Sequence, residues 1–103
     1  MMTVGQIRES LYEQLRLQGK TSDFYKDLAE DYLYYWKLKK ELIKDIKKKG
    51  IRYSAINGNG ISVEKANESV LNLQKTTATM LKILADLNLK EPMHKPDPEN
   101  DYL

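Results

Sequence analysis

Apolar residues near the N-terminus are spaced by three, four and four positions, which places them on one face of a helix: Val4, Ile7, Leu11 and Leu15. Gly19 follows this pattern and suits the left-handed residue that commonly ends a helix. The sequence therefore predicts a short N-terminal helix that ends before residue 20.

A second, longer segment reads as one helix from about Phe24 to Lys49. The preceding "TSD" at residues 21–23 supplies side chains that can cap its start, and Gly50 stops it. At 1.5 Å per residue such a helix is about 40 Å long, too long to be covered by one short partner.

A third segment has apolar positions that alternate in steps of three and four, as in a coiled-coil seam: Val70, Leu73, Thr77, Met80, Leu84 and Leu87. Asn67 is expected to cap its start and Asn88 to take the left-handed conformation at its end, while Pro92 prevents continuation. All three prolines lie in "EPMHKPDPENDYL", residues 91–103, which we expect to be a flexible acidic tail after a single domain of residues 1–90.

The stretch "GIRYSAINGNGISVEKANESV" separates the two long helices and contains two glycines near its centre. It matches neither the Walker phosphate loop nor the dinucleotide fingerprint, because no Lys-Ser or Lys-Thr pair and no G-x-G-x-x-G follow. Asn-Gly between β-branched and aromatic residues instead favours a β-hairpin. The expected fold is mainly α: an antiparallel hairpin of two long helices joined by a short β-hairpin and preceded by a short N-terminal helix.

The middle of the second helix, "YLYYWKL", is apolar or aromatic all round its axis. A helix of this kind is normally buried on all sides, and the third helix can cover only one of them. Neighbouring subunits are one possible cover, which makes a candidate oligomer interface of Tyr32, Leu33, Tyr35 and Trp36. In the alternative interpretation, the tyrosines lie at the surface with their hydroxyls in water.

Composition excludes several classes of protein. The chain of 103 residues has no cysteine, and therefore no disulfide framework or thiolate metal site. It has neither an apolar run of the ~18 residues that span a membrane nor a signal-peptide pattern, so we expect a soluble intracellular protein.

Charge is strongly segregated along the chain although its net value is only +2. Residues 37–49 carry seven lysines and two acidic residues, net +5, whereas residues 21–36 and residues 91–103 are each net −3. The acidic tail could dock on a basic partner or shield the lysines of its own chain, and the sequence does not decide between these alternatives.

Five of the lysines form one stripe on the second helix, and Arg52 lies just beyond it. This lysine stripe consists of Lys37, Lys40, Lys44, Lys47 and Lys48, and together with Arg52 it is a candidate DNA-binding surface. The alternative is a solvated helix end whose lysines interact with the helix dipole. The first helix, with Arg8, Arg16 and Lys20, is a second candidate for DNA contact, although a packing helix with a polar outer face explains these residues as well.

The residues give little support for catalysis. His94 is the only histidine and lies among the prolines of the tail, so a histidine-based triad has no rigid setting. The acidic clusters, Glu30 with Asp31 and the carboxylates of the tail, have no cation-binding loop signature. We therefore expect no enzymatic activity, no cofactor and no metal.

Taken together, the long helix, "KKKGI", the polar "NGNG" segment and "KANESVLNLQKTTATMLKILADLNLKEP" resemble the phage terminase small subunits. The resemblance covers about residues 21–92. It departs at Glu68, where proline is common, and at Ile83, where leucine is. The positions that match the third segment of that family are Asn67, Met80, Leu81, Ile83, Leu84, Leu87, Leu89 and Pro92.

The resemblance implies a viral DNA-packaging component of a phage or prophage, located in the host cytoplasm. Such subunits form rings, bind the viral double-stranded DNA, and recruit or regulate the large terminase subunit, which holds the ATPase and nuclease. Many relatives carry an N-terminal helix-turn-helix, but about twenty residues before the long helix leave room for only one short helix. Two other classes stay open: a small nucleic-acid-binding regulator, which could be dimeric, and a helical assembly protein that does not bind DNA.

Overall fold

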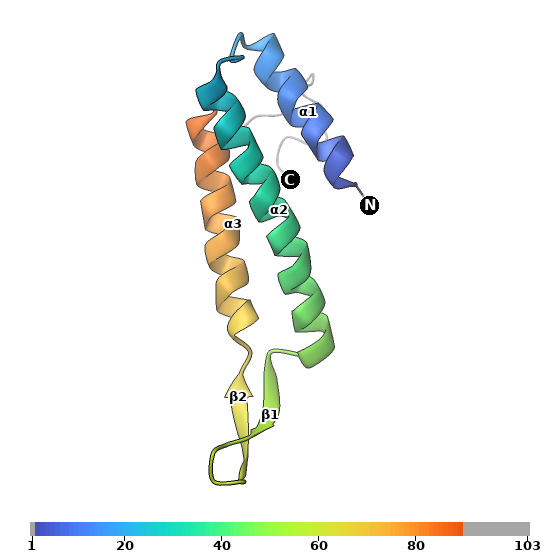
Figure 1. The fold of residues 1–103 in the computed structure, drawn as a ribbon, viewed down its shortest axis with the longest axis vertical. Coiled ribbons are helices and arrows are strands. Elements are labelled where there is room, and N and C mark those ends of the chain that lie inside the picture. The colour runs from blue at the N-terminus through green and yellow to red at the C-terminus, as the bar shows by residue number, and fades with distance from the viewer. Residues whose placement is uncertain (1, 90–103) are drawn as a thin grey trace, which may run out of the picture.

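The computed structural model describes residues 2–89, which form three helices and one two-stranded antiparallel hairpin (Figure 1). In chain order these elements are α1 (Val4–Leu17), α2 (Asp23–Lys49), β1 (Arg52–Ile56), β2 (Ser62–Ala66) and α3 (Glu68–Asp86). Helices α2 and α3 lie side by side and run in opposite directions, α1 packs against α2, and the hairpin extends from the far end of the helices. The expected acidic tail lies outside the described residues.

The structure confirms a mainly helical chain with a short β-hairpin, and it matches the expected pair of long helices in part. α3 has 19 residues against the 27 of α2, so the two helices are not equal partners. In addition, α1 is a third packing member that covers its own side of α2.

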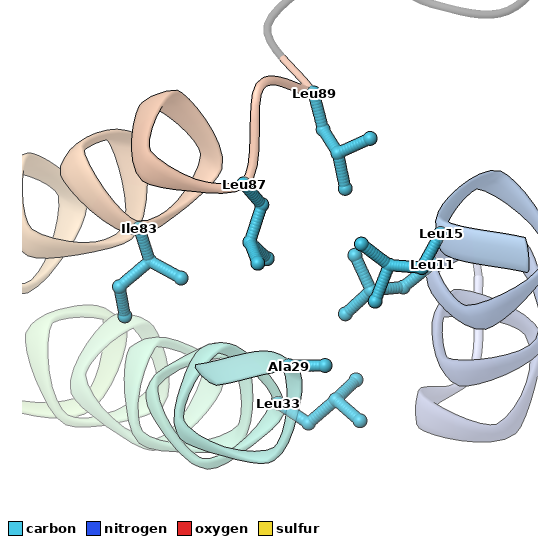
Figure 2. Close-up of a cluster of buried hydrophobic side chains, with 7 residues drawn as sticks. All are labelled: Leu11, Leu15, Ala29, Leu33, Ile83, Leu87 and Leu89. Atoms are coloured by element: carbon cyan, nitrogen blue, oxygen red, sulfur yellow. The ribbon is translucent and has the colours of Figure 1, made fainter. Parts of the chain in front are cut away.

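The core lies where all three helices meet, near the beginning of α2 (Figure 2). The side chains that converge there come from α1, α2, α3 and the residues after α3: Leu11, Leu15, Ala29, Leu33, Ile83, Leu87 and Leu89. Burial of each leucine or isoleucine side chain contributes roughly 1.5–3 kcal/mol, so this one cluster fixes how the helices are placed.

The two ends of α1 are set by local signals. Thr3 accepts a hydrogen bond from the backbone N–H of Gln6, and the Gln6 side chain accepts one from the backbone N–H of Thr3, which forms a capping box. Gly19 has a φ of +70° after the helix, as its position in the sequence predicted. The turn into α2 is therefore short, and it folds α1 back along α2.

The end of α3 also follows its sequence signals, with one shift of register. Asn88 has a φ of +58°, as predicted for the residue that ends the helix. Thr76 and Ile83 are more deeply buried than the predicted seam residues Thr77 and Leu84. The most buried face of α3 therefore contains Thr76 and Ile83 together with Met80.

The hairpin pairs Arg52 with Ala66 at its base and Ile56 with Ser62 near its tip. At the tip, the Asn57 side-chain oxygen accepts hydrogen bonds from the backbone N–H groups of Asn59 and Ile61, and Gly60 takes a φ of +77°. The glycines therefore serve the geometry of a turn, which confirms the hairpin in place of a phosphate loop.

Asn67 ties the base of the hairpin to the helices. Its side chain is buried, donates to the carbonyl oxygen of Gly50 at 2.8 Å, and accepts from the backbone N–H of Ser69 at 3.0 Å. The hydroxyl of Ser69 in turn donates to the Asp45 carboxylate at 2.7 Å. One N-cap residue thus joins the end of α2 to the start of α3 and fixes the direction in which the hairpin leaves the helices.

A polar clamp holds α1 against α2. Arg8 and the hydroxyl of Tyr12 on α1 both donate to the Glu30 carboxylate on α2. The hydrogen bonds from Arg8 and Tyr12 lower the pKa of Glu30 below its usual range. Burial, and next the hydrogen bond to Glu30, raise the pKa of Tyr12 to about 12.

We predict that Glu30→Gln lowers the stability of the fold at neutral pH and makes that stability less dependent on pH in acid. Because folding lowers the pKa of Glu30, the ionised Glu30 carboxylate stabilises the fold fully above the ordinary glutamate pKa of about 4.3. This stabilisation is lost as the pH falls from there through the lowered pKa of the folded state. The difference in urea midpoint between wild type and Glu30→Gln should therefore be largest at neutral pH and shrink in acid. Glu13 and Asp45, whose pKa values are also lowered, are present in both proteins and cancel in the difference.

Glu41→Gln is the matched control, because Glu41 pairs with Lys44 on α2 and makes no bridge to α1. Its urea midpoints should follow those of the wild type across the same range. If the difference in urea midpoint between wild type and Glu30→Gln stayed constant down to acid pH, the role assigned to the clamp would be contradicted.

Candidate nucleic-acid interface

One face of α2 changes from apolar to basic along its length. The residues on this face follow each other at steps of four, four, three, four and three: Ala29, Leu33, Lys37, Lys40, Lys44 and Lys47. Ala29 and Leu33 are buried and cluster with Leu11 and Leu15 of α1 (Figure 2). Beyond the start of α1, no helix of residues 2–89 lies above the same face, and there the face carries lysines.

The structure brings the predicted lysine stripe together on this uncovered part of α2. Lys37, Lys44, Lys47 and Lys48 are exposed, whereas Lys40 is half-buried with its ammonium 4.9 Å from the centre of the Trp36 ring. Lys44 also lies 3.6 Å from the Glu41 carboxylate, an exposed contact of small energetic weight. The far part of the stripe is therefore available to an anionic partner.

Arg52 and Lys49 lie next to the stripe but are engaged within the chain. Arg52 pairs with Glu64 across the hairpin. Lys49 lies 3.4 Å from the Asp45 carboxylate, and its ammonium is 5.4 Å from the centre of the Tyr53 ring. Arg52, which the sequence placed among the DNA-binding candidates, thus has a carboxylate partner in the chain, in an exposed pair of small energetic weight.

The cations of α1, the second candidate surface, also have partners within the chain. Arg8 belongs to the clamp on Glu30, and Arg16 pairs with Glu13 of the same helix. Lys20 donates to the carbonyl oxygen of Leu87 at 2.5 Å and so joins the α1–α2 turn to the end of α3. Packing and local pairing account for these residues.

Most residues of the candidate oligomer interface pack against side chains of their own chain. Leu33 is only 1% exposed, because α1 covers the side of α2 that the sequence left for another subunit. Tyr32 and Tyr35 are half-buried and pack against the core. Trp36 is also half-buried, whereas Tyr34, which was not among the candidates, is 64% exposed.

A groove that the sequence did not indicate lies where the start of α1 separates from α2. This fork groove has a volume of about 580 Å³ and is lined by Thr3, Val4, Tyr34, Trp36, Lys37, Leu38, Lys40 and Glu41. The spacing of residues within α2 could not reveal it, because it forms only when the first turn of α1 lies beside the middle of α2.

Other kinds of site find no support in residues 2–89. No three acidic or histidine side chains of this part of the chain are grouped as a metal site would require. Likewise, none of its helices combines the length and apolarity that a membrane crossing needs. Comparisons with known proteins do not place the chain in a family, because no family model, curated protein or solved structure matches it.

Proposed function

We propose that the protein is the small subunit of a phage or prophage terminase, a DNA-packaging adaptor without enzymatic activity of its own. The observation that carries the proposal is the exposed lysine stripe on the uncovered end of α2. The motif resemblance over residues 21–92 supplies the biological setting. In that setting the adaptor binds viral double-stranded DNA in the host cytoplasm and recruits or regulates the large ATPase and nuclease subunit.

The chemistry of the stripe favours the DNA backbone over base edges. Lysine ammoniums bind phosphate as point charges and lack the planar fork with which arginine reads guanine. Lys44, Lys47 and Lys48 are exposed on α2, a helix that packs against α3. Binding of this kind is weak for one subunit and sensitive to salt, so several copies are needed for useful affinity.

Exposed apolar side chains support assembly into a homo-oligomer, which we propose to be a ring. They occur at the start of α2, on its middle, along the hairpin and on the outer face of α3: Phe24, Tyr34, Ile51, Ile56, Ile61, Leu71 and Leu81. A two-stranded hairpin is also only marginally stable when nothing packs on it, and a neighbouring subunit would supply such packing.

The second candidate function is a small dimeric DNA-binding regulator that uses the same lysine stripe. Sedimentation equilibrium separates the two, because the chain has a mass of 12.0 kDa and each added subunit is readily resolved. We expect species larger than a dimer. A monomer or dimer at high concentration would contradict the ring and favour the regulator.

The triple variant Lys44→Gln, Lys47→Gln, Lys48→Gln is predicted to bind duplex DNA with only a small part of the wild-type affinity. The slope of log affinity against log salt should become shallower by about 0.9 for each lysine that binds a phosphate in the wild type. Glutamine keeps the helix propensity and much of the length of the side chain, so the fold should be retained. Fluorescence anisotropy with a labelled duplex at several salt concentrations measures both quantities.

The matched control is Lys75→Gln with Lys82→Gln, which neutralises two exposed lysines of α3. Its affinity and its salt slope should stay near those of the wild type. Equal losses in the two variants would show that only net charge matters and would exclude the stripe as the binding surface.

A further inference from the structure

The fork groove combines aromatic walls with two ammonium groups at one place. Tyr34 and Trp36 supply rings, Val4 and Leu38 supply aliphatic surface, and Lys37 and Lys40 supply positive charge. Lys40 is held with its ammonium 4.9 Å from the centre of the Trp36 ring. Apolar surface thus lies directly beside positive charge.

This combination fits a peptide better than duplex DNA. The phosphates of a duplex need a row of accessible cations and gain nothing from apolar walls. Aromatic-lined grooves, in contrast, recognise extended proline-containing segments, whose rings pack on aromatic side chains at little cost in conformational entropy. An occupant with both prolines and carboxylates would match the rings and the two lysines of the groove. The Glu41 carboxylate, which also lines the groove, lies 3.6 Å from the Lys44 ammonium.

Such a segment follows α3 in the same chain. Residues 91–103 contain all three prolines and carry a net charge of −3. Leu89, the last described residue, lines a second groove together with Ile7, and Ile7 lies one turn of α1 from Val4 in the fork groove. Fourteen residues beyond Leu89 can span up to about 45 Å, more than twice the length of α1.

We propose that the fork groove binds the acidic, proline-containing segment of residues 91–103 of the same chain, with proline rings against Tyr34 and Trp36 and carboxylates beside Lys37 and Lys40. This docking does not depend on DNA binding. A consequence that does rest on the proposed function is that the segment competes with DNA at Lys37 and Lys40 and leaves Lys44, Lys47 and Lys48 open.

Trp36 is the only tryptophan in the chain, so its quenching by acrylamide reports directly on the fork groove. Acrylamide is uncharged, and its access is therefore insensitive to the charge changes themselves. The segment variant is Asp97→Lys with Glu99→Lys and Asp101→Lys, and the groove variant is Lys37→Glu. Lys40 is left unchanged because its contact with Trp36 would alter the emission by itself.

The acrylamide quenching constant of Trp36 should rise in the segment variant and in the groove variant of the full-length chain. In a chain that carries both the segment and the groove substitutions, the quenching constant should return toward the wild-type value. None of these quenching constants should depend on protein concentration. Lys47→Glu, the same substitution about 15 Å further along α2, is the matched control and should leave the constant unchanged. Circular dichroism verifies that each variant keeps its helices.

An unchanged quenching constant in the segment variant would overturn the proposal. So would protection that appears only at high protein concentration, because the occupant would then be the segment of a second copy. Protection of Trp36 by single-stranded oligothymidylate, with no response to the segment variant, would also overturn it and assign the groove to nucleic acid.

Discussion

The structure depends on a difference in length between two helices that pack together. α1 has 14 residues and α2 has 27, so α1 can follow α2 over only about half of its length. Where α1 lies on α2, the shared face buries Ala29 and Leu33 against Leu11 and Leu15. Beyond that point no helix among the described residues covers the face, and apolar side chains there would lack a helix to pack against.

Both candidate sites follow from this constraint. The uncovered half of the face carries the lysine stripe, whose charges are close together but solvated. The boundary between the covered and uncovered halves forms the fork groove, because the first turn of α1 diverges from α2 beside Trp36 and Lys37. One packing limit thus produces a cationic surface and, next to it, a groove of mixed apolar and basic character.

The sequence predicted those features that depend on neighbours along the chain. Helix spacing, the positive φ of Gly19 and Asn88, the hairpin and the N-cap at Asn67 are of this kind. Contacts between elements could not be read in the same way. The spacing within α2 shows that Leu33 is apolar, but only the position of α1 shows that it is buried within one chain.

The same distinction applies to the candidate sites. The lysine stripe was predictable because its residues share one helix, whereas the pairing of Arg52 with Glu64 depends on the register of the hairpin. The fork groove was not predictable, since its walls come from α1 and from two sides of α2. The bond from Asn67 to the Gly50 carbonyl likewise joins residues that only the folded hairpin brings together.

The most direct test of the lysine stripe as a DNA-backbone surface measures the reactivity of each lysine in the unmodified protein. Brief acetylation with and without duplex DNA, followed by mass spectrometry of the peptides, gives the protection of every lysine at once. If the stripe binds the backbone, DNA protects Lys44, Lys47 and Lys48 and leaves Lys75 and Lys82 as reactive as before. Equal protection of the α2 and α3 lysines, or protection confined to α3, would contradict this role of the stripe.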